Sequence, residues 1–349
     1  MIPEVALAKS TFVACGESRI SWDNLVRLIR KTKTTNDAVF DKQSDLLGNP
    51  RQRIAIITEM IGMHRRGLAH TDITQLLIIA KSSQATDLRD MIYAFYSITL
   101  LTTFPDYTRS IELLYAEIIH MYVNSIKWEM SYSKWHDLSE AQRTFQLMSI
   151  LYSAGALHQH RTLPSWIPDL TFLWHLSPIW CKTTSTTLTA SNKDVWSTSV
   201  RSEFRAGGWC RETFEIIDRP HGMHQLQLSV IMLDTIITVS ETSAASTPDV
   251  SEHSFMPHES DSSTLRYGRS FFRTTKGDTG IATPGVQAGD KIAIVLGGDV
   301  PVVLRPCHAD GHTLQTFRLL CECLVQNDAV MNGVMAESCL TLSEDVVLI

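Results

Sequence analysis

Apolar residues in the first half of the chain recur with the spacing of amphipathic helices. The pattern predicts a helix over residues 22–31, with Leu25 and Leu28 among its apolar residues and Ser21 as its N-terminal cap. The same spacing predicts further helices over residues 53–63, 71–79 and 140–154.

Two stronger helical signals lie between these segments. Thr86 or Asp87 can cap a helix that runs toward the middle of the chain. Pro105 and Asp106 are expected to open a second helix, whose apolar residues recur every three or four positions as far as Tyr122. A stripe of this kind must face a core, so we interpret its aromatic residues as packing residues.

The period changes at about residue 160, where Pro, Gly, Ser and Thr begin to separate short β-rich runs. Residues 225–239 and 317–325 predict strands, and residues 290–305 predict a strand, a turn around Gly297 and a second strand. The expected product is a small barrel or a twisted antiparallel sheet, which makes the chain an α+β protein. Two inserts rich in Ser and Thr are expected to interrupt it, at residues 183–202 and 240–264.

Composition and charge indicate a globular protein and argue against nucleic-acid and membrane partners. The 349 residues are 44% hydrophobic and 19% charged, which is typical of a globular protein and excludes a disordered chain. The net charge of −6 does not favour a nucleic-acid partner. The longest uncharged apolar stretch, residues 91–105, is shorter than the ~18–20 residues of a membrane span. No signal peptide pattern opens the sequence, and seven irregularly spaced cysteines suggest reduced thiols, so we expect a cytoplasmic protein.

The sequence carries few signs of a catalytic or metal-binding site. The sequence has no nucleophile elbow, no zinc-protease motif and no phosphate-binding glycine loop. Cys15 could act as a nucleophile, but nothing in the sequence brings a histidine to it. One group of residues close in sequence could suggest a metal site: Cys307, His308, His312, Cys321 and Cys323. A single residue between two cysteines is not zinc-knuckle spacing, so we predict no catalytic residue, no cofactor and no metal.

Four stretches, taken in order, resemble fungal heterokaryon-incompatibility (HET) domain proteins. They read PEVALAKSTFVACGESRISWDNL at residues 3–25, ATDLRDMIYAF with PDYTRSIELLYAEI at residues 85–95 and 105–118, LPSWIPDL at residues 163–170, and RSFFRTTKGDTGIATPGVQAGDKIAIVLGGDVPVVLRP at residues 269–306. The residues that carry the resemblance are Glu4, Trp22, Asp87, Arg89, Asp90, Tyr93, Asp106, Tyr107, Pro164, Trp166, Pro168, Asp169, Gly297 and Arg305.

The resemblance implies a division of the chain into three parts. Residues 1–50 would be the last part of an α/β HET domain, residues 51–160 a helical region, and residues 161–349 a mostly antiparallel β domain. The first two blocks of the HET domain are absent, so the chain looks like an N-terminally truncated member. An exposed apolar patch is expected where those blocks would pack.

The family acts in allorecognition, in which unlike partners trigger programmed cell death. The HET domain is thought to be similar to TIR domains, and the absent blocks are those that build their NAD-cleaving site. The resemblance therefore implies a non-enzymatic protein that binds a protein partner. Two other functions stay open: an accessory protein of a fungal secondary-metabolite pathway that binds a small molecule, and a non-functional relic.

The motif residues have expected physical roles. Asp87 and Asp90 suit the start of a helix, and Arg89 is expected to bridge to a carboxylate of a neighbouring element, with a ligand phosphate as the alternative. Pro164 and Pro168 restrict the backbone around Trp166, which is expected to dock into the core, while Asp169 can cap the segment that follows. Gly297 is expected in a turn, and Arg305 is expected to pair across strands.

Overall fold

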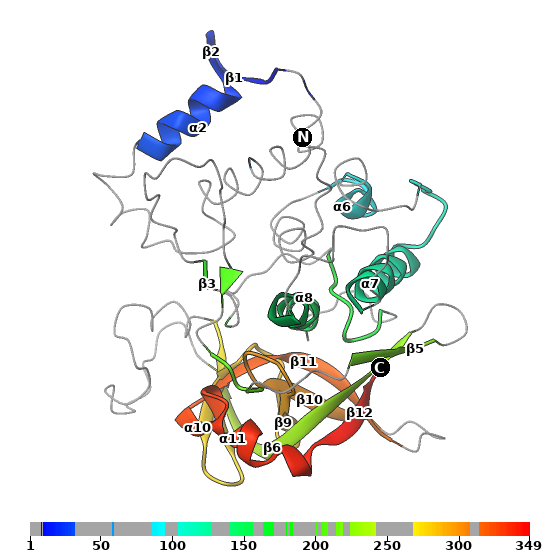
Figure 1. The fold of residues 1–349 in the computed structure, drawn as a ribbon, viewed down its shortest axis with the longest axis vertical. Coiled ribbons are helices and arrows are strands. Elements are labelled where there is room, and N and C mark those ends of the chain that lie inside the picture. The colour runs from blue at the N-terminus through cyan, green and yellow to red at the C-terminus, as the bar shows by residue number, and fades with distance from the viewer. Residues whose placement is uncertain are drawn as a thin grey trace. The chain divides into compact units, whose positions relative to one another are not determined.

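The computed structural model describes residues 8, 10–31, 58, 85–94, 104–127, 140–155, 163–170, 179, 182–183, 200–201, 204–208, 214–218, 224–241, 268–307 and 314–349. The chain forms two compact units (Figure 1). Unit 1 contains Met1–Arg109 and Thr183–Val200, and unit 2 contains Ser110–Lys182 and Arg201–Ile349. The short strands β3 (Lys182–Thr183) and β4 (Val200–Arg201) lie where the chain crosses between the units.

Unit 1 opens with a hairpin that leads into a helix. Strands β1 (Phe12–Cys15) and β2 (Ser18–Ser21) pair antiparallel around Gly16, which takes a φ of 60°. Helix α2 (Trp22–Lys31) follows directly, and the Ser21 hydroxyl accepts the backbone N–H of Asn24 at 3.3 Å. The helix predicted over residues 22–31 and its cap are therefore confirmed.

Helix α6 (Asp90–Tyr93) begins later than the sequence predicts. Its N-cap residue is Arg89, which makes no side-chain cap hydrogen bond. Asp87 instead accepts the backbone N–H of Arg89 at 3.0 Å, so its carboxylate closes the turn before the helix. The capping assigned to Thr86 or Asp87 was therefore wrong, because the Asp87 carboxylate is used by the turn.

Helices α7 (Ile111–Lys127) and α8 (Glu140–Ser153) belong to unit 2. The expected start of α7 at Pro105 was wrong, since Asp106 accepts the backbone N–H and the hydroxyl of Thr108 and forms a turn there. Ser110 then caps the helix by accepting the backbone N–H of Leu113 at 3.3 Å. Helix α8 ends two residues before Gly155, as the sequence indicates.

The remaining elements of unit 2 are mostly strands. They are β5 (Phe214–Ile217), β6 (Gln225–Glu241), β7 (Ser270–Thr274), β8 (Thr279–Ala282), β9 (Lys291–Val295), β10 (Val302–Cys307), β11 (Gln315–Val325), α10 (Asp328–Met331), α11 (Val334–Ser338), the 3-10 helix η5 (Leu340–Leu342) and β12 (Glu344–Leu348).

These strands form one sheet that closes on itself. The order is β10-β9-β6-β12-β11-β8-β7, with β5 on β6 and with additional pairings of β10 with β11 and of β6 with β7. The extra pairings complete two rings of strands that share β6, β12 and β11, and β5 pairs with β6 outside these rings. Only β11 and β12 run parallel among the described pairs. The protein is thus α+β with a mostly antiparallel barrel, as predicted.

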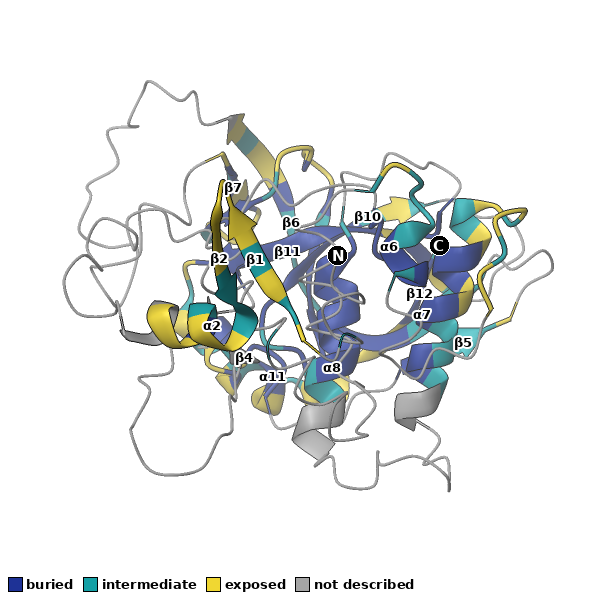
Figure 2. Ribbon diagram, turned by 90° about the horizontal axis from the view of Figure 1, so that it is seen from above, coloured by how far each residue is buried: buried dark blue, intermediate teal, exposed yellow. Residues whose placement is uncertain are grey.

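A buried segment, which we call the strap, is bound to the barrel by hydrogen bonds. Residues 163–170 are buried throughout, and Trp166 is fully buried. Ser165 ties the strap to the last strands, because its hydroxyl donates to the carbonyl of Ile349 at 2.5 Å and accepts the N–H of Leu319 at 2.9 Å. Figure 2 shows the barrel strands as mostly buried, whereas the hairpin and α2 of unit 1 are largely exposed.

Some predicted elements cannot be compared with the structure. The predicted helix over residues 71–79 and Glu4 lie outside the described residues, and of residues 53–63 only Thr58 is described, in a helical conformation. Most of both inserts also lies outside them. The second insert begins later than predicted, since Ser240 and Glu241 belong to β6. Among the described helices, none is both long and apolar enough to cross a membrane.

Candidate functional site

Residues 85–94 and 104–109, which belong to or adjoin the second of the four stretches, meet in unit 1. We call this group the motif cluster; its residues are Asp87, Arg89, Asp90, Tyr93, Asp106 and Tyr107. The Arg89 guanidinium donates to both carboxylate oxygens of Asp87 at 2.9 Å. Its Nη1 reaches the other half of the motif, where it donates to the carbonyls of Tyr107 and, at 3.2 Å, of Arg109. The expected carboxylate partner on a neighbouring element was therefore wrong, since Arg89 uses Asp87 beside it and contacts the other segment through carbonyls.

The two tyrosines lock the same segments together. The Tyr107 hydroxyl donates to Asp90 at 2.6 Å, and the Tyr93 hydroxyl donates to the carbonyl of Asp106 at 2.8 Å. Their rings lie edge to face with centroids 5.2 Å apart, and the Arg89 guanidinium lies 5.5 Å from the centre of the Tyr107 ring. The cluster therefore fixes the position of residues 104–109 against the start of α6.

Asp87 and Tyr107 keep their ordinary charge states near neutral pH. Hydrogen bonds from the Arg89 side chain and backbone lower the pKa of Asp87, so it stays ionised. The hydrogen bond to Asp90 raises the pKa of Tyr107, so its hydroxyl stays protonated. A general base or nucleophile needs a pKa moved toward the working pH, and these two shifts move away from it.

Apolar side chains of unit 1 are exposed in two places. Beside the cluster, Phe104 is 76% exposed and Tyr107 is 50% exposed. In the hairpin and α2, Phe12 and Leu28 are 64% and 52% exposed. Single exposed apolar residues are ordinary, but the Tyr107 ring also carries the Arg89 guanidinium over it, and Phe104 lies three residues earlier in the same segment.

The motif residues of the strap and of α2 lie at buried or partly buried positions. Pro164, Pro168 and Asp169 lie in the buried strap on either side of Trp166, and the segment that Asp169 was expected to cap lies outside the described residues. Trp22 begins α2 and is partly buried.

In the barrel, Gly297 takes a φ of 76°, which suits the predicted turn. Arg305 donates to both oxygens of Asp290, at 2.8 and 2.9 Å, from the strand beside it. This is a cross-strand pair, and its carboxylate is almost fully buried.

The thiols of β11 are core side chains. Cys321 and Cys323 are buried in the barrel, where burial raises the pKa of Cys321 to about 11 and that of Cys323 well above its usual range. Such thiols stay protonated and cannot ligate a metal without losing a proton. His308 and His312 lie outside the described residues, and Cys15 is an exposed free thiol in unit 1.

A different group of ligand-type side chains meets in unit 2. We call His120, Asp218 and His224 the histidine–aspartate cluster. His120 lies in the middle of α7, Asp218 directly follows β5, and His224 directly precedes β6. Strands β5 and β6 pair antiparallel with Ile217 opposite Gln225, so the register places Asp218 and His224 opposite each other.

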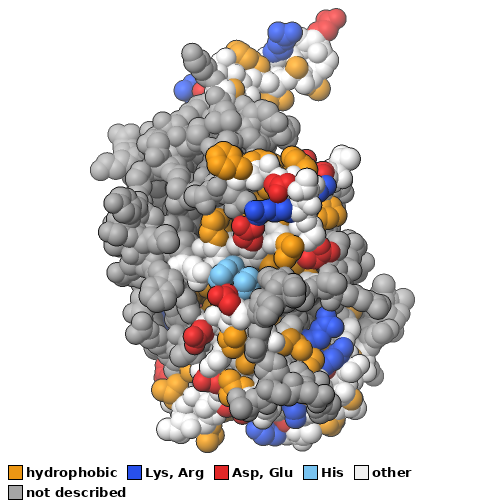
Figure 3. Space-filling view, turned by 90° about the vertical axis from the view of Figure 1, so that its right-hand side faces the viewer, with side chains coloured by type: hydrophobic (Ala, Val, Ile, Leu, Met, Phe, Trp, Pro, Cys, Tyr) orange, Lys and Arg blue, Asp and Glu red, His pale blue; other side chains and the backbone are white. Residues whose placement is uncertain are grey.

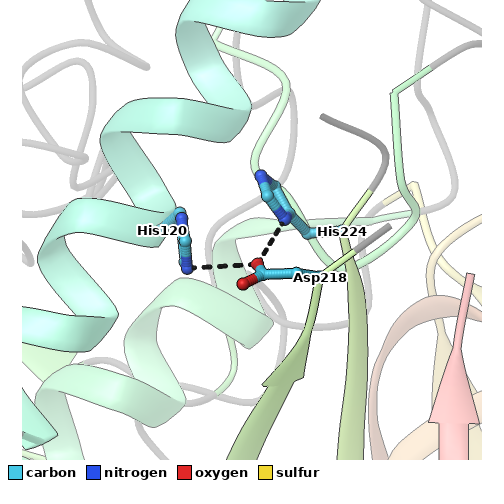
Figure 4. Close-up of side chains that lie close together, drawn as sticks. All are labelled: His120, Asp218 and His224. Carbon is cyan, nitrogen blue, oxygen red and sulfur yellow. Dashed lines mark ion pairs between the residues drawn. The ribbon is translucent and has the colours of Figure 1, made fainter. Parts of the chain in front are cut away.

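The three side chains converge on the carboxylate (Figure 4). Asp218 Oδ1 lies 3.0 Å from Nδ1 of His224 and 3.6 Å from Nε2 of His120. The two imidazole rings are stacked, with centroids 4.4 Å apart and planes at 29°. The Asp218 side chain is 75% exposed, and Figure 3 shows the two described histidines at the surface with an acidic side chain beside them.

One nitrogen atom of this cluster lacks a hydrogen bond of acceptable geometry within the described residues. Nδ1 of His224 is buried and has no hydrogen-bond partner of acceptable geometry within the described part of the chain, although it is close to Asp218. His120 Nε2 lies 3.0 Å from the amide nitrogen of Asn124, one turn along α7. Burial lowers the pKa of His120, His224 lowers it further and Asp218 opposes the shift, so the neutral imidazole is favoured.

The backbone fixes the position of His224. Its carbonyl accepts the indole N–H of Trp166 at 3.2 Å. The buried motif tryptophan thus holds the residue from which the imidazole extends. No local spacing in the sequence signals this cluster, because His120 lies far from the other two and only the β5–β6 register brings Asp218 and His224 together. The cluster is the only group of this kind among the described residues.

Comparisons with known protein families, with curated proteins and with solved structures give no match for the chain.

Proposed function

We propose that the chain is a non-enzymatic protein of the HET type that acts in the cytoplasm by binding a protein partner in allorecognition signalling. The family assignment rests on the four motifs of the sequence. The exposed aromatic side chains of residues 104–109 are the observation that carries the binding role: Tyr107, with Arg89 over its ring, and Phe104 in the same segment.

The polar groups of the motif cluster are engaged in holding its segments together. Arg89 holds Asp87 and two carbonyls of the other half of the motif, while both tyrosine hydroxyls donate within the cluster. Groups committed to such contacts are poor candidates for proton transfer to a substrate. The arrangement supports a role in shaping a surface.

The exposed side of the cluster has the composition of a binding hot spot. Tyrosine and arginine are the residues most enriched where binding energy concentrates, since each offers a large rigid contact area together with a polar end. Tyr107 presents half of its surface while its hydroxyl is fixed by Asp90, so it loses little conformational entropy on binding. Phe104 adds an exposed apolar ring in the same loop.

A heterokaryon assay tests the proposal. One fungal strain expresses the full chain and is fused with strains of different genotypes, and cell death is scored in the fused cells. We expect death in at least one pairing, and we expect the double variant Phe104→Ser with Tyr107→Ser to abolish it. Leu342→Ser in unit 2 is a matched control, because Leu342 is 70% exposed and should retain the reaction.

Two results would contradict the proposal. One is a reaction that the double variant leaves at the wild-type level. The other is release of nicotinamide from NAD by the purified protein, if Glu4→Ala abolishes that release, because the chain would then be a catalyst.

A further inference from the structure

We propose that His120, Asp218 and His224 bind a divalent transition-metal ion, with zinc as the best match. This site is in unit 2 and does not depend on the binding surface proposed for unit 1. Imidazole nitrogen and carboxylate oxygen are ordinary zinc ligands, and two histidines with one carboxylate leave a coordination position open.

The separations between the ligand atoms fit one ion. Zinc lies about 2.0–2.2 Å from nitrogen and oxygen ligands, so two ligands of a tetrahedral site are roughly 3.3–3.5 Å apart. The distances of 3.0 and 3.6 Å from Asp218 Oδ1 to the two imidazole nitrogens lie on either side of that value. All three ligand atoms lie within 4.8 Å of one another. The two stacked imidazole rings would turn apart so that the plane of each contains the ion.

The buried nitrogen of His224 gives an independent reason for a cation. Within the described residues, Nδ1 is shielded from solvent and lies 3.0 Å from Asp218 Oδ1 without hydrogen-bond geometry, which leaves a buried polar atom poorly satisfied. A metal ion between Nδ1 and Oδ1 of Asp218 would satisfy that nitrogen and would neutralise the carboxylate.

The elements around the cluster hold it in place. His120 is anchored by α7, and the paired strands β5 and β6 place Asp218 opposite His224. The carbonyl of His224 is held by the Trp166 indole at 3.2 Å. Asn124 lies 3.0 Å from Nε2 of His120, so it would give up this contact when the metal binds.

The exposure of Asp218 leaves one side of the site open. Its side chain is 75% exposed, whereas those of His120 and His224 are 26% and 15% exposed. Two largely buried imidazoles with one exposed carboxylate would hold an ion at the surface, with water in the remaining coordination position. Such an ion would link α7 to the β5–β6 hairpin.

Zinc titration of the full chain, after removal of metal by a chelator, tests the proposal. We compare the wild type with Asp218→Asn and His224→Gln, using a competing chromogenic chelator to measure affinity. Each variant should lower the zinc affinity of the site by at least about 100-fold, since loss of even a residue that only hydrogen-bonds to a metal ligand lowers metal affinity 10–100-fold. His253→Gln, in the Ser- and Thr-rich insert, is the control and should bind as the wild type does.

Cobalt substitution identifies the ligand type. Cobalt in the proposed site should give the visible absorption of a tetrahedral or five-coordinate ion without the near-ultraviolet band of a thiolate ligand. A thiolate band would place the metal on cysteines and overturn the assignment.

Thermal unfolding keeps the test independent of folding defects. Asp218→Asn changes an exposed side chain, so without metal it should unfold at the wild-type temperature. Zinc should raise the unfolding temperature of the wild type and leave that of Asp218→Asn unchanged. Equal zinc affinity in the wild type and both variants would refute the site, whatever the outcome of the heterokaryon assay.

Discussion

Two arginine–carboxylate ion pairs, one in each unit, differ in how far they are exposed to solvent. In unit 1, Arg89 pairs with Asp87 two residues before it, and their side chains are 24% and 33% exposed. In unit 2, Arg269 lies 3.8 Å from Glu322 of β11, and their side chains are 2% and 6% exposed. The first pair is local and solvated, whereas the second depends on the closed barrel.

The two ion pairs therefore differ in role: the exposed pair of unit 1 shapes a surface, and the buried pair of unit 2 depends on the fold. A solvated pair contributes little to global stability, so Arg89 matters for where it holds the Tyr107 segment. A buried pair contributes to stability only while both partners remain, because one partner alone leaves an uncompensated charge. Substitutions in the two units should therefore have different consequences.

The largest effect is expected from Glu322→Gln. The change removes the negative charge that Glu322 places 3.8 Å from the buried Arg269, while the new amide can still accept the N–H of Ile179, which Glu322 accepts at 2.6 Å. We expect the free energy of unfolding to fall by about 3–5 kcal/mol, measured by urea denaturation. Glu344→Gln, an exposed acid on β12, is the control and should change it by less than about 0.5 kcal/mol.

A paired replacement sharpens this prediction. The double variant Arg269→Met with Glu322→Leu removes both charges and should recover most of the lost stability. A double variant as unstable as Glu322→Gln would show that the loss comes from packing.

A pH-dependent effect is expected at Asp299, beside the Gly297 turn. Burial raises the pKa of Asp299 to about 7, from 3.8 for a free carboxyl. Between pH 4 and 7 the folded protein then keeps a proton that the unfolded chain has lost, so this residue reduces stability as the pH rises. The loss reaches about 4 kcal/mol above pH 7.

Asp299→Asn should remove that loss. Its stability should match the wild type near pH 4 and exceed it increasingly toward pH 8, measured by unfolding at a series of pH values. A constant difference between the two proteins across this range would show that Asp299 titrates normally.

A smaller effect is expected from Gly280→Ala in β8. An added Cβ would lie 2.4 Å from the carbonyl oxygen of Leu324 and 2.3 Å from the Phe272 ring. The strands must move apart, so we expect a loss of about 1–3 kcal/mol in the free energy of unfolding. Gly155→Ala should cost less, because its nearest contact is at 3.5 Å.

The smallest effect on the barrel is expected from Arg89→Met. The unfolding midpoint of unit 2 should stay unchanged, while amide hydrogen exchange should accelerate at residues 104–109, which lose their contacts with the guanidinium. A shift in the unit 2 midpoint would show that the motif cluster supports the whole fold.

Features that depend on neighbouring residues in the sequence were predicted correctly. The Ser21 cap predicted α2, and prolines around an apolar tryptophan predicted the buried position of Trp166. The start of α7 was misplaced, because Asp106 can cap a helix or a turn and the pattern does not distinguish them. Strand β12 was not predicted, since its short apolar run gains meaning only through pairing with β6 and β11.

The histidine–aspartate cluster could not be predicted for a similar reason. It depends on the β5–β6 register and on the packing of α7, which are tertiary features. The cysteines and histidines between residues 307 and 323 suggested a metal site only because they are close in sequence. Of these, Cys321 and Cys323 are buried side chains of a core strand.

The central claim is that the motif cluster presents a binding surface and performs no chemistry. Tyr107 tests it, because its ring is half exposed while its hydroxyl donates to Asp90. The measurement is the heterokaryon reaction of Tyr107→Phe beside that of Tyr107→Ser. The account predicts that Phe, which keeps the ring and loses the hydroxyl, retains the reaction and that Ser abolishes it. Loss of the reaction in both variants, with both proteins folded, would contradict the account, because the exposed ring would then not be sufficient for binding.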